Sequence, residues 1–198
     1  MQNFKNIFLF LGSAAGIYSF IRLVRQDILS FFNKSKLTIK FNQRGDLKVW
    51  RVGPPYIPIG EIRKVATVHV CNKGKKSASN CEALVQIIKD GDEIGQTFPL
   101  HWADTPYDAR STSIEGINIG RLPRRLDVVF TQKKQNESGC SVASAQALAT
   151  GVQHDQFFLP QGEHKIKIQV NYNSGDSIEE TFVIESPDIW KNLKMIIL

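Results

Sequence analysis

The chain has 198 residues and a net charge of +6, with 42% hydrophobic and 22% charged residues. This balance is ordinary for a globular protein, and it excludes collagen-like and fully disordered classes. The surplus of positive charge favours partners with anionic surfaces. Three cysteines, Cys71, Cys81 and Cys140, are too few for a disulfide framework and fit a reducing compartment.

Residues 1–33 are predicted to form a membrane anchor helix and a juxtamembrane segment. Residues 7–20 carry no charge, and Ile21 extends the apolar run to Arg22. The run is shorter than the roughly 20 residues of a usual span, but Arg22 and Arg25 can reach the lipid headgroups and lengthen the usable helix. We therefore predict a retained, single-pass signal anchor. A cleaved signal peptide and a buried or peripheral helix stay open as alternatives.

The charges around the apolar run predict the orientation of the chain. Lys5 precedes the run, whereas five basic residues follow it: Arg22, Arg25, Lys34, Lys36 and Lys40. Positive charge near a span tends to stay in the cytoplasm, so we expect the C-terminal domain to be cytoplasmic. The inverted orientation would give an exported, membrane-tethered adhesion or envelope module. Gly12 and Gly16 have the GxxxG spacing that lets two helices approach closely, which predicts a homodimer contact.

After the anchor, apolar and polar residues alternate in short runs separated by turn residues, which is typical of half-buried β-strands. The predicted strands cover residues 37–41, 47–50, 62–72, 81–89, 114–119, 126–130, 157–159, 166–172 and 178–184. This pattern predicts an all-β fold, an antiparallel β-sandwich of about eight strands over residues 34–186. Residues 132–154 are expected to be a loop. The apolar tail, residues 187–198, is expected to pack on the sandwich or on the membrane surface.

Two segments resemble known sandwich domains. The first is VHVCNKG at residues 68–74 with Ala78, and the second is LPQGEHKIKIQV at residues 159–170. They are similar to patterns of immunoglobulin-like domains related to fibronectin type III and CARDB adhesion modules. The resemblance covers roughly residues 60–90 and 155–186. It implies an Ig-like sandwich that acts as a noncatalytic binding or spacer module, and it carries no functional residues with it.

Two groups of residues are candidates for binding. His101, Trp102, Asp104 and Tyr107 form an unusual run in a predicted loop, where binding residues tend to occur. The alternative is that Trp102 plugs the edge of the sandwich. The second group is basic. Arg121, Arg124 and Arg125, with Lys133 and Lys134, form one predicted cluster, and Lys73, Lys75 and Lys76 form another. Both suit anionic lipid. Nucleic-acid binding is not expected, because no aromatic stacking platform accompanies the charges.

Cys71 and Cys81 are candidates for a disulfide. His69 shares a strand face with Cys71, so the three side chains would supply three of the four ligands of a structural zinc site if the strands formed a hairpin. No fourth ligand can be named, so no metal and no cofactor are expected. The sequence holds no catalytic motif. We therefore predict a membrane-anchored, noncatalytic binding or scaffolding module with a protein partner. An enzyme with an unrecognised loop site stays as a further alternative.

Overall fold

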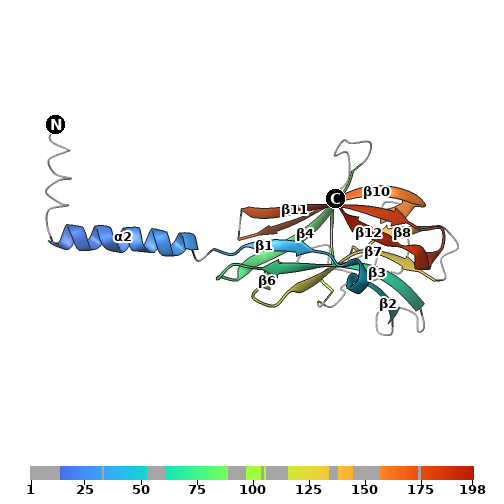
Figure 1. Cartoon of the computed structure of the whole chain (residues 1–198), viewed down its shortest axis with the longest axis horizontal. Helices are drawn as coiled ribbons and strands as arrows, with labels where there is room; N and C mark the ends of the chain where they lie inside the picture. Colours follow the sequence, from blue (N-terminus) through green and yellow to red (C-terminus); the bar gives the residue numbers. More distant parts are fainter. Residues whose placement is uncertain are drawn as a thin grey trace.

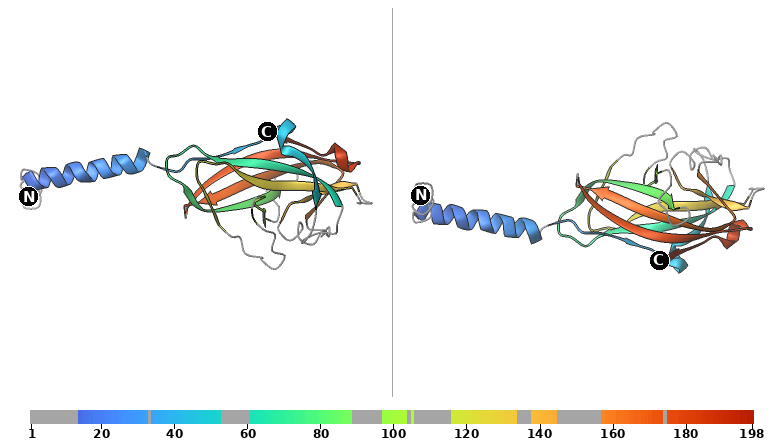
Figure 2. Two further views of the ribbon diagram at one scale, coloured as in Figure 1. Left: turned by 90° about the horizontal axis from the view of Figure 1, so that it is seen from below. Right: turned by 90° about the horizontal axis from the view of Figure 1, so that it is seen from above.

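The computed structural model describes residues 14–32, 34–52, 61–88, 97–103, 105, 116–133, 138–144, 157–173 and 175–198. These residues form two antiparallel β-sheets and a long N-terminal helix that projects from one end of them (Figures 1 and 2). The prediction of an all-β, antiparallel, two-layer fold is confirmed. The described residues form twelve strands, four more than the predicted number of about eight.

The helix α2 (Ala14–Phe32) is the element nearest the N-terminus in the described part of the chain. Its exposed side chains are largely apolar, with Tyr18 at 69% and Leu23 at 59% relative exposure. Within the described residues, no helix has both the length and the hydropathy of a membrane span. Residues 1–13 lie outside the description, and they contain Gly12 and the first half of the predicted apolar run, so the transmembrane helix stays a prediction. Gly16 is buried in α2.

The first sheet has the strand order β1-β3-β7-β8-β9, and β2 pairs with β3. Its strands are β1 (Leu37–Lys40), β2 (Leu47–Val52), β3 (Glu61–Asn72), β7 (Arg124–Gln132), β8 (Gly139–Val142) and β9 (Phe158–Pro160). A bulge between Ala66 and Thr67 shifts the register of β3 against β7. Where a turn was predicted between β1 and β2, the chain makes one helical turn, α3 (Gln43–Asp46), because the Asn42 side chain accepts a hydrogen bond from Arg44 N and caps it.

The second sheet has the strand order β12-β11-β10-β4-β5, and β6 pairs with β4. Its strands are β4 (Ala78–Ile88), β5 (Thr97–Pro99), β6 (Ile117–Ile119), β10 (Gly162–Tyr172), β11 (Asp176–Ser186) and β12 (Lys194–Ile197). The hairpin of β10 and β11 runs in unbroken register from Gly162–Ser186 to Tyr172–Asp176. Its turn holds Asn173 at a φ of 51°, a left-handed conformation that asparagine tolerates better than most residues.

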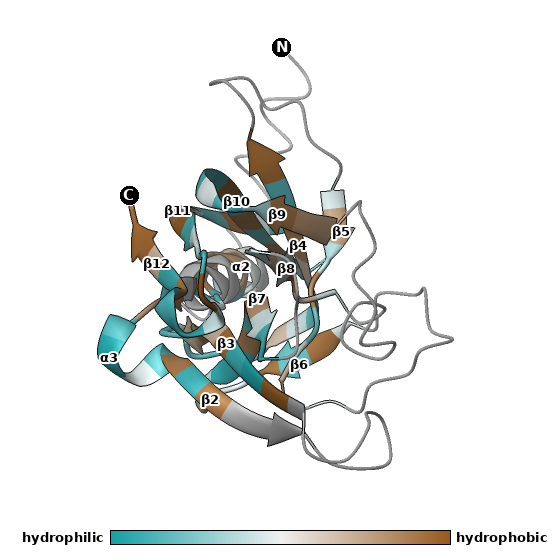
Figure 3. Cartoon of the chain, turned by 90° about the vertical axis from the view of Figure 1, so that its right-hand side faces the viewer, coloured by the Kyte–Doolittle hydropathy of each residue, from teal (hydrophilic) through white to brown (hydrophobic). Residues whose placement is uncertain are grey.

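The hydrophobic core lies between the two sheets. Along β10, residues Ile166, Ile168 and Val170 are fully buried while the side chains between them are partly exposed. The same alternation of hydrophilic and hydrophobic residues is visible along the strands in Figure 3. Burying each such side chain stabilises the fold by roughly 1.5–3 kcal/mol. The core is therefore the main source of the stability of the sandwich.

Several elements of the fold were not predicted from the sequence. The strands β5 and β8 lie where irregular chain was expected, and the tail forms the short 3-10 helix η2 (Trp190–Asn192) followed by β12. The tail thus packs on the sandwich as an edge strand beside β11. The strands β3 and β4 do not form the hairpin on which the disulfide and zinc candidates depended. They belong to different sheets, so the loop of residues 73–77 crosses from one layer to the other.

Candidate functional site

The His101–Trp102 segment joins the two sheets. Leu100 N donates a hydrogen bond of 2.9 Å to Ala83 O in β4, and two residues later Trp102 forms a β-bridge with Leu126 in β7. Trp102 is only 4% exposed and belongs to the core. The structure therefore places this tryptophan in the edge of the sandwich, as the alternative interpretation of the sequence proposed, and it is not an exposed loop residue.

The imidazole of His101 is also enclosed, at 5% exposure. Its Nε2 lies 3.2 Å from Thr105 Oγ1, and the same hydroxyl donates to Trp102 O at 2.7 Å. Asp104 and Tyr107, the other two residues of this predicted site, lie outside the described residues. His101 and Trp102 are consecutive residues of an extended segment, so their side chains point to opposite faces. The structure does not bring them together into one binding surface.

Several polar side chains that the sequence interpretation passed over are buried along β3 and β7. Thr67 Oγ1 donates to Asp127 Oδ1 at 3.2 Å, and both residues are less than 9% exposed. Arg63 is 2% exposed, and its guanidinium lies 4.9 Å from the centre of the Phe130 ring. A signal was present in the sequence for Asp127, which interrupts the apolar run of residues 126–130, but not for Arg63, which lies between Glu61 and Lys64. Buried charges of this kind stabilise a fold only when they are paired or hydrogen-bonded.

A second missed pair lies at the start of the first sheet. Asp46 is 6% exposed, and its Oδ1 lies 3.1 Å from His69 Nε2. Its other oxygen accepts a hydrogen bond of 2.7 Å from Asn42 N. The aspartate thus ties the helical turn α3 to β3 and closes the turn between β1 and β2. We assign this pair a structural role, since both oxygen atoms of the Asp46 carboxylate have partners inside the fold.

All three cysteines are free thiols. Cys71 is half-buried on β3, while Cys81 and Cys140 are fully buried. The proposed Cys71–Cys81 bridge is not formed, because β3 and β4 lie in opposite sheets and Cys81 is directed into the core. For the same reason His69, Cys71 and Cys81 do not gather, and no cluster of metal-ligating side chains is found within the described ranges.

The basic residues are grouped differently from the two predicted clusters. The strand β6 pairs with β4, with Ala78 opposite Ile119, and this pairing sets residues 120–123 beside the loop of residues 73–77. We call the exposed residues of these two loops and of the adjoining start of β7 the basic rim; they are Lys73, Lys75, Lys76, Arg121, Leu122 and Arg124. Arg125, next in the chain, is half-buried opposite His69.

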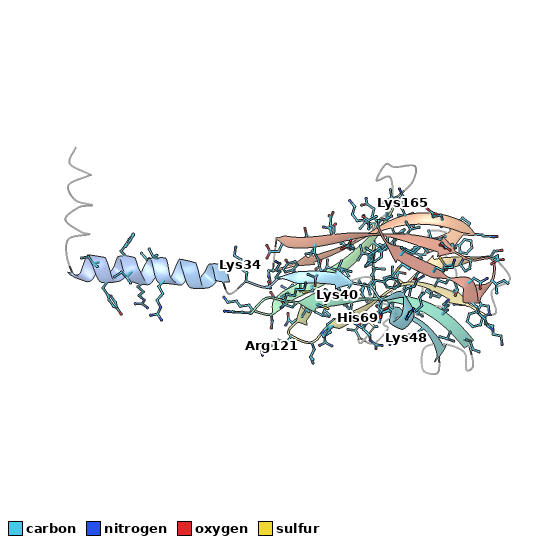
Figure 4. All side chains as sticks on the ribbon, viewed as in Figure 1. Lys34, Lys40, Lys48, His69, Arg121 and Lys165 are labelled. Carbon is cyan, nitrogen blue, oxygen red and sulfur yellow. The ribbon has the colours of Figure 1, made fainter. Side chains whose placement is uncertain are left out.

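Lys133 does not belong to this rim. It follows β7 at the opposite end of that strand, where its backbone nitrogen donates to Ile62 O, and Lys134 lies outside the described residues. Figure 4 shows Arg121 and Lys34 at the end of the sandwich from which α2 projects, and Lys48 and Lys165 farther along the molecule. The basic rim and the helix therefore share one end of the domain.

Asn72 organises that end of the sandwich. Its Oδ1 accepts hydrogen bonds from the backbone nitrogens of Lys36 at 3.1 Å and Gly74 at 2.8 Å. Its Nδ2 donates to Lys76 O at 2.7 Å and to Ile119 O at 3.1 Å. One side chain thus joins three segments, which are the linker after α2, the 73–77 loop and the end of β6.

Gly74 brings the linker and the loop into close contact. A Cβ atom at this position would lie 2.5 Å from Lys36 N and 2.6 Å from Ser35 Cα, closer than real Cβ atoms approach backbone. The Ser35 hydroxyl also accepts a hydrogen bond from Asn173 Nδ2 in the β10–β11 turn. Residues 34–36 are therefore part of the packed end of the sandwich. Sequence reasoning identified Asn72 and Gly74 only as turn residues.

An open hollow of about 610 Å³ lies at the other end, beside η2. Lys64 borders it and donates from its Nζ to the backbone oxygens of Lys191 and Leu193, and burial lowers the pKa of Lys64. These bonds tie the first sheet to the chain that leads into β12. Both acidic and basic side chains line the hollow, and Glu185 and Asp188 are the acidic ones. The described lining gives no arrangement of nucleophile and base.

Comparison with known proteins gives no relative for this chain. No protein-family model, no curated protein and no solved structure matches it.

Proposed function

We propose that this chain is a noncatalytic binding or scaffolding module, an immunoglobulin-like sandwich held at a membrane by its N-terminal helix. The observation that carries the proposal is the junction between α2 and the sandwich. Only residue 33 separates the end of α2 from the segment that Asn72 and Gly74 fix to the domain. A helix whose apolar run lies in the bilayer would therefore hold the sandwich near the membrane surface, at a distance set by the helical residues 22–32 and by the tilt of the helix.

A short, fixed junction has a functional consequence. Flexible linkers let a domain search a volume that grows with their length, whereas a linker packed on the domain, as residues 34–36 are, allows little search. Restriction to the membrane surface raises the effective concentration of the domain for partners in the same membrane. The arrangement suits a module that contacts partners lying in or on the same membrane, and we expect a protein partner there.

We propose a noncatalytic module because the side chains that could act as acids or bases are engaged in packing and hydrogen bonds within the fold. His101 is enclosed and its Nε2 is engaged with Thr105, while Trp102 fills the core. The Asp46 carboxylate is bound by Asn42 and His69. Side chains that serve the fold in this way are poor acids and bases for a substrate, which must come within hydrogen-bond reach of them.

The proposed side of the membrane is the cytoplasm. The excess of lysine and arginine after the apolar run supports this orientation. The three free cysteines also support it, because two of them, Cys81 and Cys140, are buried thiols that a reducing compartment keeps intact. The exported orientation remains the competing proposal, and it differs only in topology.

Membrane integration is tested by alkaline carbonate extraction of cells that express the full chain. We expect the chain to stay in the membrane pellet, and the double variant Leu9→Arg/Leu11→Arg to move to the supernatant, since the two arginines cut the uncharged run to residues 12–21, which is too short to cross a bilayer. The matched control is Val49→Arg/Ile189→Arg, which changes side chains that are 61% and 54% exposed on the sandwich. Release of the unaltered chain, or retention of the Leu9/Leu11 variant, would contradict the anchor.

A further inference from the structure

The end of the sandwich beside α2 carries a concentrated positive charge. The rim residues Lys73, Lys75, Lys76, Arg121 and Arg124 are all exposed, and Lys36 of the linker is exposed beside them. Acidic residues near this end include Asp176, at the start of β11, Glu82, within β4, and Asp46, which is bound to His69. The basic charges therefore outnumber the acidic ones here. The fold brings these basic residues together from two segments that are far apart in the sequence.

One apolar side chain, that of Leu122, is exposed among these basic residues. Leu122 is 80% exposed, the highest value among the exposed large hydrophobic residues of the described chain. It lies between Arg121 and Pro123 in the loop that joins β6 to β7. A single exposed leucine is ordinary on a protein surface. A leucine that follows Arg121 and lies two residues before Arg124 combines apolar and basic side chains, as do the amphipathic segments that lie at the boundary between headgroups and acyl chains.

The rim also has a defined shape. Asn72 fixes both of its loops, through Gly74 and Lys76 in one and through Ile119 at the start of the other. The same asparagine fixes the linker through Lys36. The charges are thus presented by a rigid platform whose position relative to residues 34–36 is set by the fold. A platform of this kind loses little conformational freedom when it meets a flat surface.

From this arrangement we infer that the basic rim docks on anionic lipid headgroups, with Leu122 entering the interface, so that the sandwich lies with its α2 end against the bilayer. The inference rests on the proposed membrane anchoring and adds the surface of contact and the chemistry of the lipid. Each basic residue near an anionic surface changes the ratio of docked to free domain by about fivefold. Lipid is favoured over single-stranded nucleic acid because the exposed rim contains no aromatic side chain on which bases could stack.

The test uses the full chain reconstituted into lipid nanodiscs, with an environment-sensitive nitrobenzoxadiazole probe at Leu122→Cys in a Cys71→Ser background. Cys81 and Cys140 are fully buried and should not take the label. Discs of phosphatidylcholine are compared with discs that contain phosphatidylserine as well. We expect probe emission that is stronger and shifted to the blue in the phosphatidylserine discs only. Salt at 1 M, where the Debye length is about 3 Å, should abolish the difference.

Charge reversal identifies the surface. The triple variant Lys73→Glu/Lys75→Glu/Lys76→Glu should lower the docked-to-free ratio at least a hundredfold, because three fivefold contributions are removed and then opposed. The control variant Lys48→Glu/Lys133→Glu/Lys165→Glu changes the same charge at exposed lysines outside the rim. It should keep the probe signal of the unaltered chain. An equal loss in both variants would overturn the inference, since it would then reflect net charge alone.

The outcomes separate this inference from the proposed anchor. A chain present in both kinds of disc with equal probe emission keeps the anchor and overturns the rim contact. Binding to phosphatidylserine discs alone, with the blue shift, supports the rim contact and contradicts the anchor. A chain absent from both kinds of disc contradicts both.

Discussion

Asn72 Oδ1 accepts a hydrogen bond of 3.1 Å from the backbone nitrogen of Lys36, and this bond joins the end of β3 to the segment that follows α2. The two residues lie 36 positions apart in the chain. Lys73 N returns a bond of 2.8 Å to Lys36 O, so both polar groups of the Lys36 backbone are bound. The junction on which the proposed function depends is therefore built into the fold of the sandwich.

Replacing Asn72 by alanine should destabilise the domain by about 1–3 kcal/mol. The change removes the partners of two backbone nitrogens and two backbone oxygens, each of which loses part of its hydrogen-bond energy. The measurement is urea unfolding of the full chain. Asn118→Ala is the control, because Asn118 Oδ1 accepts only a 3.3 Å bond at an exposed site. Equal stability of the two variants would contradict the organising role of Asn72.

Gly74→Ala should loosen the linker as well as destabilise the domain. Its Cβ would overlap backbone atoms of residues 34–36, which cannot move away as a flexible side chain could. We expect a loss of about 1–3 kcal/mol and faster trypsin cleavage after Lys34 or Lys36. Gly120→Ala is the matched control, since its nearest neighbour would be Ser77 Oγ at 3.7 Å. Cleavage at the same rate in both variants would show that the linker is not clamped at Gly74.

Trp102→Ala tests whether this residue serves the core or a ligand. The side chain is 4% exposed, so its removal should leave a cavity and cost about 3–5 kcal/mol of unfolding free energy. Thermal and urea unfolding both measure this. Leu122→Ala, at an 80% exposed site, should change stability by less than about 0.5 kcal/mol. A Trp102→Ala variant as stable as Leu122→Ala would restore the interpretation of Trp102 as a surface binding residue.

The strands that the sequence predicted well are those with one buried face. In β10 the buried residues Ile166, Ile168 and Val170 alternate with polar ones, and in β11 the hairpin turn at Asn173 fixes the register. The strand β7 was predicted too short, because every residue from Leu126 to Gln132 is buried and the alternation disappears. The strands β5, β8 and β12 have only three or four residues each, too few to establish a period.

The candidate site could not be predicted because it depends on long-range pairing. The disulfide and zinc candidates required a hairpin between the strands that hold Cys71 and Cys81, yet β3 and β4 occupy different sheets. That crossover separates Cys71 from Cys81. The pairing of Ala78 with Ile119 then brings together two basic loops that the sequence holds about 45 residues apart. Local residue patterns contain no information on such pairings.

The stability of the domain should fall as the pH rises above about 9. Burial raises the pKa of Cys140 to about 12 and that of Cys81 to about 11, from an ordinary value of 9.0 in the unfolded chain. Below pH 9 the thiols are neutral in both states and the stabilisation is complete. Between pH 9 and 11 the unfolded chain loses these protons first, so each thiol contributes a loss of up to about 1.4 kcal/mol per pH unit.

Urea unfolding at pH 8, 9, 10 and 11 measures this slope. Cys140→Ala should reduce it by about 1.4 kcal/mol per pH unit, whatever its effect on stability at pH 8. Ser141→Ala, a buried neighbour that does not titrate in this range, serves as the control and should keep the original slope. An unchanged slope in Cys140→Ala would mean that this thiol is not buried in neutral form.

The most direct test of the central claim is the side of the membrane on which the sandwich lies. Lys133→Cys places a thiol at an exposed position outside the basic rim, in a Cys71→Ser background. Intact cells that express the full chain are treated with a membrane-impermeant maleimide, before and after lysis. A cytoplasmic module held at the membrane predicts a chain in the membrane fraction that is labelled only after lysis. Labelling in intact cells would contradict the cytoplasmic placement and favour the exported module.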